Sequence, residues 1–511
     1  MCDIRDYFMS TTVAPPGSSR VTEQGAGWAA CSGPGAWRLD VPANTRPLSW
    51  IRPSVLWRAR NDVIARRLHD PTDDARAAWV RLAGERALAT GQNPDFVVRV
   101  GEGDTASFVL LGDTGEGDDS QYAVVPDLLA RADGVDLAVI CSDVNYPTGD
   151  SIDYRERFYR PYRNLLAPIL AVPGNHDWYD GLIGFMHHLC GLDAPGDPAW
   201  PRSIRGRLGG WLWRTPPPAD PAALAHMAAD RARDVQRLAH PQPGPYLAID
   251  VGAVRLVGID TGIQGTIDAE QAAWLRRVSF DDPRPKVLIT GKPIYVDGEH
   301  HPCRIVGETG TVDDVVRDAR ANYVAAIGGD IHNYQRYPVS LPDGRTLQYV
   351  VSGGGGAFMH ATHQIPRVRL PGVDEADFRC YPLRGDSLAR YSQLYDRRLA
   401  GGHGRLALSP VEAATYMADL LGGDTTRGDR TRLSARARIA GRIIQNAPGG
   451  RGFHRLVSEF FDWNDPPLFK SFLRVDVTAG ALRVRCYGVS GCAEAEGHAP
   501  VEDDWTVALS S

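Results

Sequence analysis

Short apolar runs alternate with longer amphipathic stretches from about residue 95 onward. Seven of these runs contain few polar positions: DLAVICSD, PILAVPGNHD, YLAIDVG, VRLVGIDT, KVLITGKP, YVAAIGGDIH and LQYVVSGGGG. Uninterrupted apolar runs of this length predict strands buried on both faces. Several of the runs stop abruptly at Gly, Asp, Asn or His. Such strands, separated by helical patterns, indicate an α/β fold whose functional site lies at the strand ends.

Other parts of the chain do not follow this alternation. Residues 1–104 form an N-terminal extension, partly helical at 50–90, where the Arg-rich helix faces are expected to be solvated surface. At the end of the extension, FVVRV and ASFVLLGD predict a hairpin around a polar turn.

The expected core spans 105–361 and is interrupted by a lid-like insertion at 182–245. A mainly helical insertion follows at 362–466. Residues 467–511 are expected to supply C-terminal strands, turning at an Ala-Gly pair, that complete the core sheet.

Composition narrows the class of partner. The 511 residues carry a net charge of −6, which favours neither nucleic acid nor an anionic membrane. No apolar stretch is long enough for a membrane span, and the N-terminus does not resemble a signal peptide. The eight cysteines are scattered without a C-x-x-C pair, which predicts reduced thiols in a cytoplasmic protein. The sequence is silent on the oligomeric state.

Five short motifs stand at the ends of the apolar runs, and four of them contain glycine. In chain order they are GDTG (112–115), SDVNY (142–146), GNHDWY (174–179), GKPIY (291–295) and GDIHNYQR (329–336). Four motifs place a metal-ligating side chain directly after a run: Asp113, Asp143, Asn175 and His332. A single Asp after a strand is usually a cap or turn residue. Four such positions in order predict oxygen and nitrogen ligands that converge on a metal ion.

The order and spacing of these motifs resemble the calcineurin-like metallophosphoesterase superfamily, and most closely its purple-acid-phosphatase-like branch. The resemblance covers about 105–360 and the strands near 470–490. It implies an α/β fold of the metallophosphoesterase type, a β-sandwich flanked by helices. It also implies hydrolysis of a phosphate ester by a metal-bound hydroxide.

The resemblance assigns roles residue by residue. Asp113 and His332 correspond to ligands of a first metal, and Asp143 to a carboxylate that bridges two metals. Asn175 corresponds to a ligand of the second metal. His176 corresponds to the group that protonates the leaving oxygen, with Asp177 orienting it.

Two departures from the general family pattern fit each other. Most members carry a metal-binding His where this chain has Gly115. The purple-phosphatase branch compensates with a Tyr three residues after the bridging Asp, which here is Tyr146. A phenolate is a hard anionic ligand, so the resemblance implies iron at the first site.

Two further departures leave the second metal open. Lys292 and Asp330 stand where the family has histidines. One reading is a second ion, such as Mn, Mg, Zn or Ca, held by Asp143, Asn175 and Asp330. Another is that the Lys292 ammonium replaces that ion, and we favour this reading because it preserves the local charge balance. A third is that His300 and His301 act as substitute ligands.

The sequence therefore predicts a metallophosphoesterase that uses divalent or trivalent metal ions and acts on a small phosphorylated substrate. The alternative is a degenerate member of the same fold that binds a phosphorylated ligand or acts as a scaffold. Retention of His176 argues against this alternative, because a binding protein does not need a leaving-group acid.

Overall fold

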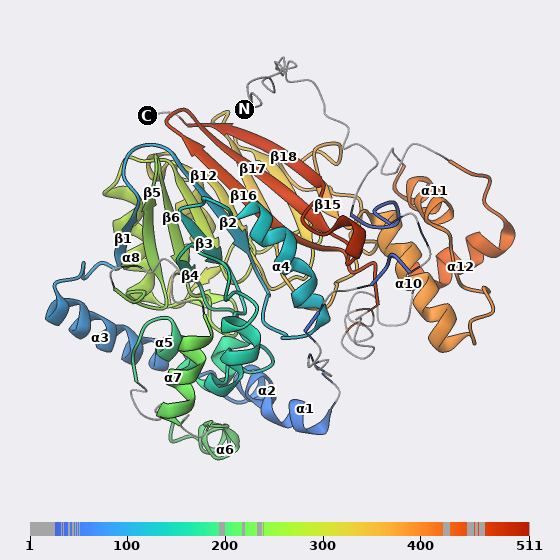
Figure 1. Ribbon diagram of the computed structural model, residues 1–511. Helices are drawn as coiled ribbons and strands as arrows, with labels where there is room; N and C mark the ends of the chain where they lie inside the picture. The colour runs from blue at the N-terminus through green and yellow to red at the C-terminus, as the bar shows by residue number, and fades with distance from the viewer. Residues whose placement is uncertain are drawn as a thin grey trace, which may run out of the picture.

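The computed structural model describes residues 26–509 with gaps at positions 32, 34, 39–40, 43–44, 46–47, 49, 51, 194–199, 217–219, 232–237, 239, 423–429, 447–453, 455–457 and 459–464. Two large β-sheets face each other across the main apolar core, and helices cover their outer faces (Figure 1). The expected α/β sandwich flanked by helices is confirmed. The expectation for residues 1–25 lies outside the described residues.

One sheet has six strands in the order β18-β17-β16-β2-β3-β4. Their bounds are β2 (Ala106–Leu111), β3 (Leu137–Ile140), β4 (Ile169–Ala171), β16 (Lys470–Thr478), β17 (Ala481–Val489) and β18 (Val501–Ala508). β2, β3 and β4 are parallel, and β16 pairs antiparallel with β2, with Leu473 opposite Leu110. Strands from the end of the chain therefore extend the sheet that carries the first three motifs.

The other sheet has eight strands in the order β1-β5-β6-β8-β12-β14-β13-β15. Their bounds are β1 (Val97–Val100), β5 (Leu247–Val251), β6 (Val254–Ile259), β8 (Lys286–Thr290), β12 (Tyr323–Gly328), β13 (Tyr334–Ser340), β14 (Thr346–Ser352) and β15 (Arg379–Tyr381). β6, β8, β12 and β14 are parallel neighbours. Two short ribbons join β7 (Thr266–Ile267) to β11 (Arg304–Ile305), and β9 (Tyr295–Val296) to β10 (Glu299–His300).

The predicted hairpin at 97–111 is wrong. β1 pairs in parallel with β5, whereas β2 belongs to the opposite sheet. The turn between them crosses from one layer of the sandwich to the other. A polar turn between two short apolar runs is found both in hairpins and in such crossovers. Because these runs do not alternate apolar and polar residues, the sequence does not indicate which strand each one pairs with.

Alternate side chains of β2 show why both faces of this strand are apolar. Phe108 and Leu110 join the core between the two sheets. Val109 and Leu111 point to the other side, where they share a cluster with Val124 of α4 (Asp119–Arg131). A strand packed on both faces positions the residue that follows it rigidly.

Helices complete the layers. α8 (Ala269–Phe280) contacts β6 and α9 (Val312–Arg317) contacts β12 of the eight-stranded sheet. α1 (Pro53–Arg58), α2 (Arg60–Arg67), α3 (Thr72–Thr90), α5 (Ile183–His188), α6 (Ile204–Leu212) and α7 (Pro221–Asp230) gather at one end of the molecule (Figure 1). α10 (Arg384–Leu399), α11 (Pro410–Leu421) and α12 (Ala435–Gln445) pack together at another side.

Short helical turns fill several connections: η1 (Ser151–Asp153), η2 (Arg155–Tyr159), η3 (Asp177–Asp180), η4 (Ala319–Ala321) and η5 (Ala493–Ala495). Among the described residues, no helix is both long and apolar enough to cross a bilayer.

The expectation that all cysteines are reduced is wrong for one pair. Cys31 and Cys492 form a disulfide that ties the N-terminal extension to the segment after β17. The two residues are far apart in sequence, so spacing gave no sign of the pairing. Cys141, Cys190, Cys303, Cys380 and Cys486 are free thiols, and Cys2 lies outside the described residues. Because disulfides persist mainly in oxidising compartments, this pair removes one support for a cytoplasmic location.

Candidate metal centre

The strand ends of both sheets converge on one place. Asp113, Asp143 and Asn175 follow β2, β3 and β4 of the six-stranded sheet. Lys292 and Asp330 follow β8 and β12 of the facing sheet. The backbone NH of Asp330 donates to the Asp113 carboxylate at 3.1 Å, which joins the two sheets directly at the site.

Three of these aspartates have strained backbones. The φ angles are 57° at Asp113, 35° at Asp143 and 64° at Asp330, all in the left-handed region. Asp tolerates this region better than most residues, but each occurrence costs free energy and persists only where the surroundings enforce it. Strain repeated at three strand ends indicates that the chain orients these carboxylates for a function.

Tyr146 stands at the centre of the first-metal group. Its side chain is fully buried, and its hydroxyl lies 3.1 Å from Asp113 Oδ1, 3.0 Å from Asp143 Oδ2 and 3.1 Å from His332 Nε2. Neighbouring ligands around an octahedral ion with metal–ligand bonds of about 2.1 Å are separated by about 3.0 Å. The three separations therefore match the edges of a coordination shell.

The donor set depends on the Tyr146 oxygen. Counting only His, Cys, Asp and Glu, the described part of the chain contains no group of three arranged to hold a metal. The Tyr146 oxygen is what connects Asp113, Asp143 and His332 into one cluster. Asp113 Oδ2 is buried without a hydrogen-bond partner, so it remains available to a cation.

His332 presents the nitrogen that a metal needs. Its Nδ1 lies 2.7 Å from the carbonyl oxygen of Phe358. Because a carbonyl only accepts, Nδ1 carries the proton, and the Nε2 lone pair faces Tyr146. The ring also stacks on His360, with centroids 4.1 Å apart. Fixing the distal nitrogen in this way is how proteins orient histidine ligands.

Gly115 is explained by the loop that carries Tyr146. A Cβ at Gly115 would lie 2.1 Å from the Val144 carbonyl oxygen, a distance no real side chain tolerates. The Tyr146 NH donates to the Gly115 carbonyl at 3.0 Å. The loop that carries Tyr146 therefore occupies the space that a histidine at 115 would need, so the two departures occur together for a steric reason.

Burial and the nearby negative charges disfavour the charged forms of the Asp113, Asp143 and Tyr146 side chains. Burial, followed by the charges of Asp143 and Asp330, raises the pKa of Asp113 well above its ordinary value. Burial also raises the pKa of Asp143, and that of Tyr146 well above its usual range. An ion among these oxygens would favour their charged forms and offset the cost of burial.

Lys292 and Asp330 form an ion pair on the second-metal side. The ammonium lies 2.7 Å from Asp330 Oδ1, and both side chains are partly exposed. His300 instead pairs with Asp313 at 2.7 Å, and His301 approaches Glu299 at 3.5 Å. The substitute-ligand reading of these two histidines therefore has no support in the structure.

Asn175 and His176 line the open side of the site. Asn175 donates to the Tyr179 hydroxyl at 2.7 Å, while its Oδ1 is buried without a partner. The His176 backbone NH donates to Asp143 Oδ1 at 2.8 Å, and its ring Nδ1 lies 2.8 Å from the Pro147 carbonyl. The proton is therefore on Nδ1 when the ring is neutral, which leaves Nε2 for a ligand or substrate.

Asp177 contacts backbone rather than His176. Its carboxylate accepts from the NH groups of Val144, Asn145 and Gly174 at 3.0–3.1 Å. The orientation of the His176 ring comes instead from Pro147 and from neighbouring aromatic rings. Asp177 thus fixes the second and third motif loops relative to each other.

One site residue was not predicted. Trp50, from the N-terminal extension, lies with its ring centroid 5.1 Å from that of His176 and 5.4 Å from that of Tyr146. Its indole NH donates to Glu116 at 3.2 Å. Trp50 precedes α1 without a motif or a periodic pattern, so the sequence carried no signal for it.

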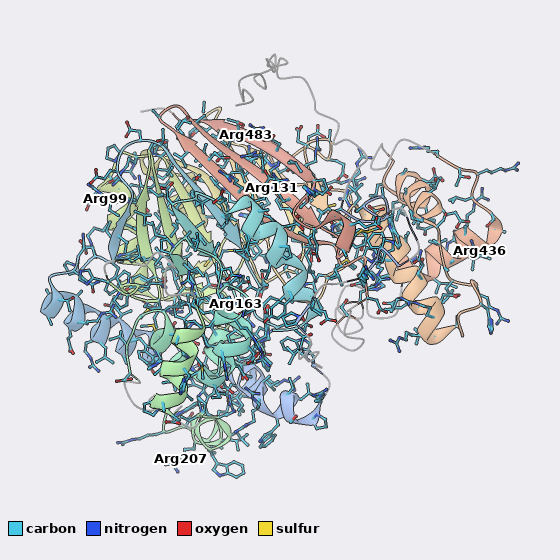
Figure 2. The ribbon with its side chains drawn as sticks, in the orientation of Figure 1. Arg99, Arg131, Arg163, Arg207, Arg436 and Arg483 are labelled. Carbon is cyan, nitrogen blue, oxygen red and sulfur yellow. A yellow bond between two sulfur atoms is a disulfide. The ribbon has the colours of Figure 1, made fainter. Side chains whose placement is uncertain are left out.

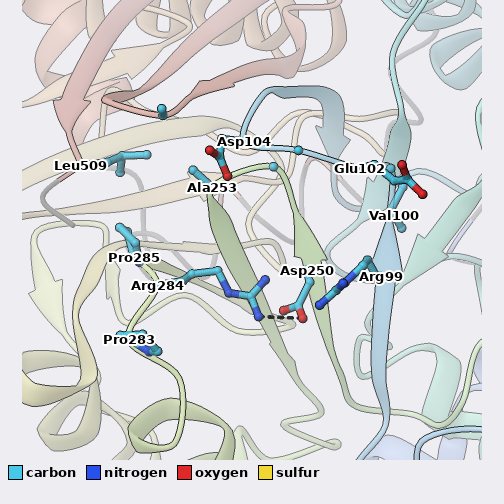
Figure 3. Close-up of a pocket in the computed structure, with 14 residues that line it drawn as sticks. Arg99, Val100, Glu102, Asp104, Asp250, Ala253, Pro283, Arg284, Pro285 and Leu509 are labelled. Carbon is cyan, nitrogen blue, oxygen red and sulfur yellow. Dashed lines mark ion pairs between the residues drawn. The ribbon is translucent and has the colours of Figure 1, made fainter.

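A separate cavity lies at the other ends of the strands. It has a volume of about 800 Å³ and is lined by residues such as Arg99 within β1, Asp104 before β2 and Arg284 before β8 (Figure 3). Arg284 pairs there with Asp250 at 2.7 Å. The predicted site residues do not line this cavity.

Comparison with known proteins supports the motif analysis. Residues 106–210 match the family model Metallophos, described as calcineurin-like phosphoesterase. The matched segment contains Asp113, Asp143, Tyr146, Asn175 and His176. This confirms the resemblance to that superfamily. No curated protein matches the chain.

Solved structures with similar folds were also found. A purple acid phosphatase, PPD1, from seeds of yellow lupin (Lupinus luteus) is 11% identical with a TM-score of 0.40, over 80% of this chain and 54% of that one. PhoD is 10% identical with a TM-score of 0.34, over 81% of this chain and 72% of that one. The chain thus spans about half the length of the lupin protein.

Proposed function

We propose, from the premise that residues 106–210 belong to a calcineurin-like phosphoesterase core, that this protein is a metal-dependent phosphoesterase. The observation that carries the proposal is the Tyr146 hydroxyl, 3.0–3.1 Å from Asp113, Asp143 and His332. Two carboxylates, a phenol and an oriented imidazole nitrogen are a donor set that suits a ferric or divalent ion.

The first metal would be held by Asp113, Asp143, Tyr146 and His332. When bound, it would neutralise phosphoryl oxygens and lower the pKa of a water molecule. The hard phenolate oxygen of Tyr146 favours iron at this position. Asn175 Oδ1, buried and without a hydrogen-bond partner, is available on the adjacent side.

Lys292 replaces the second metal in this proposal. Its ammonium pairs with Asp330 at 2.7 Å and is partly exposed, so it is able to reach a phosphoryl oxygen. A lysine neutralises charge but does not ligate while protonated. The chain therefore supports a one-metal site in which a fixed cation supplies the second positive charge.

His176 donates the proton to the leaving oxygen. Its ring is held between Tyr146 and Tyr179, with centroids 4.6 Å from each, and is partly exposed. Nδ1 is engaged by a carbonyl, so the catalytic proton belongs to Nε2. A small phosphorylated substrate would enter on this open side.

Turnover of a phosphomonoester and a phosphodiester, assayed over a series of iron, manganese, magnesium, zinc and calcium, tests the activity. We expect hydrolysis that depends on metal, and a kcat lowered by about 10²–10⁴-fold in His176→Gln. Well-folded protein that turns over neither ester with any metal would instead support the degenerate phospholigand-binding alternative.

Metal content per chain tests the lysine assignment independently of activity. We expect one tightly bound ion in the wild-type protein and a gain toward two in Lys292→His. A wild-type content of two ions per chain would rule out the replacement of the second metal by Lys292.

A further inference from the structure

An apolar face lies on the outer side of α1, α2 and α6, and α2 also contacts the loop of the third motif. Six large apolar side chains are exposed on it: Leu56 (60%), Trp57 (64%), Val63 (53%), Ile204 (87%), Leu208 (43%) and Trp211 (79%). We call this set the α1–α6 face. Exposed apolar groups this concentrated usually mark an interaction surface.

Direct contacts make the α1–α6 face continuous. The Arg60 guanidinium stacks over the Trp57 ring at 4.3 Å, and its Nη1 donates to the Trp57 carbonyl at 2.8 Å. Its Nε donates to the carbonyl of Leu212, the last residue of α6, at 2.8 Å. Arg60 therefore holds Trp57 beside the end of α6 that carries Trp211.

The α1–α6 face is also positively charged. Exposed arginines without an acidic partner among the described residues lie on or next to the same three helices: Arg52, Arg67, Arg202, Arg205 and Arg207. Residues 200–216 contain no Asp or Glu, and the one acid within 52–68, Asp62, is paired with Arg66. Figure 2 shows Arg207 at the outer edge of the α6 region. A chain of net charge −6 thus concentrates unpaired positive charge here.

We infer that the α1–α6 face binds the surface of a membrane containing anionic lipids. Exposed tryptophan and aliphatic side chains beside unpaired arginines are the composition of segments that lie in the membrane interface. The apolar groups enter the headgroup boundary, and the arginines pair with lipid phosphates and carboxylates. This partner differs from the sequence-based expectation of no membrane.

Two other partners fit the same surface less well. A second copy of this chain, joined through the same face by two-fold symmetry, would bring unpaired arginines against each other. Nucleic acid would use the arginines but would leave Leu56, Ile204 and Leu208 without an apolar environment. An anionic lipid surface fits better than either partner, because it accommodates both the exposed apolar side chains and the positive charge.

Co-sedimentation of the full-length protein with phosphatidylcholine vesicles, with and without phosphatidylserine, tests this inference. We expect binding to the anionic vesicles that weakens as salt is raised. Arg205→Gln/Arg207→Gln should lower the affinity for these vesicles by about tenfold or more. Trp57→Ser/Ile204→Ser/Trp211→Ser should remove binding, and circular dichroism would verify that each variant is folded.

A matched control exists on the helical insertion. Ile439 and Ile443 of α12 are also exposed, by 60% and 52%, and lie near arginines on a different side of the molecule, where Figure 2 marks Arg436. Ile439→Ser/Ile443→Ser should bind vesicles like wild type. The inference is overturned if wild type binds neither vesicle, if the α12 variant alone loses binding, or if light scattering shows a dimer that Trp211→Ser dissociates.

Discussion

At the residue scale, the Tyr146 hydroxyl connects groups from two sheets. Tyr146→Phe removes this oxygen and keeps the ring, so we expect the content of tightly bound metal to fall and kcat/KM to drop by about 100-fold or more. If the ion is ferric, a visible absorption band from the phenolate should disappear as well. Metal analysis and absorption spectra of purified variants check this.

Tyr154→Phe is the control for that substitution. Tyr154 is also fully buried, but its hydroxyl has no hydrogen-bond partner among the residues that the structure describes. Its replacement should leave metal content and turnover unchanged. Equal losses in both variants would mean that removing a buried hydroxyl, rather than a ligand, causes the defect.

The Gly115 position offers a second test at this scale. The added methyl of Gly115→Ala would lie 2.1 Å from the Val144 carbonyl, so the loop that carries Tyr146 must move. We expect the free energy of unfolding to fall by about 1–3 kcal/mol and metal binding to weaken. Denaturant titrations would measure the change in stability.

Gly84→Ala is the matched glycine variant. Gly84 lies inside α3, and no atom comes within 4 Å of the position its Cβ would take. Alanine there should stabilise the helix by about 0.5–1 kcal/mol. Destabilisation by both variants would indicate that crowding at Gly115 is not the cause.

Asp113, Asp143, Tyr146 and His332, which the sequence analysis proposed for the site, lie together in the structure because they follow strand ends. Asp113, Asp143 and His332 stand in turns after apolar runs, and parallel strands bring such turns together. Trp50 could not be predicted in this way. It reaches His176 only through the tertiary packing of the N-terminal extension, which leaves no local pattern.

At the element scale, Arg76 fastens α3 to the core. Its side chain is buried, and it pairs with Asp260 after β6 and with Asp268 at the start of α8, both at 2.8 Å. Asp260 also accepts from the Trp178 indole in the third motif at 2.8 Å. One arginine therefore links the N-terminal extension to both the sheet and a site loop.

Arg76→Ala should lower the free energy of unfolding by about 3–5 kcal/mol, because it leaves the buried Asp260 carboxylate without its cation. Arg81→Ala, at an exposed position on the same helix, should change it by less than about 0.5 kcal/mol. Equilibrium unfolding of both variants provides the comparison. Similar stabilities would contradict the anchoring role of Arg76.

The positions of helices and strands were predicted more accurately than the pairing of the strands. The apolar runs became strands, and the periodic patterns at 50–90 and in 384–445 became helices. The partners of β1 and β2 were missed because their short apolar runs lack the alternation that sets a register. Which sheet a strand joins depends on packing across the whole sandwich.

At the scale of the whole molecule, buried neutral histidines make stability depend on pH. Burial lowers the pKa of His188 to about 3 and that of His454 to about 4. Burial also lowers the pKa of His363 well below its usual value. In the unfolded chain these rings take up protons near pH 6.5, whereas in the folded chain they resist protonation.

The stability that comes from keeping these histidines neutral is therefore fully present above about pH 6.5. It is lost as the pH falls toward the pKa values of the histidines in the folded protein. We expect the free energy of unfolding at pH 5 to be lower than at pH 7.5 by about 2 kcal/mol for each of His188 and His454. Unfolding of His188→Asn should depend less on pH, while the exposed His403→Asn should behave like wild type. If the free energy of unfolding changed equally with pH in both variants, His188 would be excluded as a cause of the pH dependence.

The disulfide between Cys31 and Cys492 could not be predicted from the number and spacing of the cysteines. Scattered cysteines suggested thiols, but Cys31 and Cys492 meet because the extension runs back to the C-terminal strands. Pairing over such a distance depends on the finished fold. Sequence spacing identifies disulfides only where a local framework exists.

The antiparallel pairing of β2 with β16 has a consequence for folding during translation. During synthesis, β2 presents an unpaired edge until residues 470–478 leave the ribosome. Asp113 follows β2 directly, so the strand that positions it lacks one neighbour for most of translation. The candidate site is therefore completed late, and a nascent chain halted before Lys470 would hold Asp113 beside an open, aggregation-prone sheet edge.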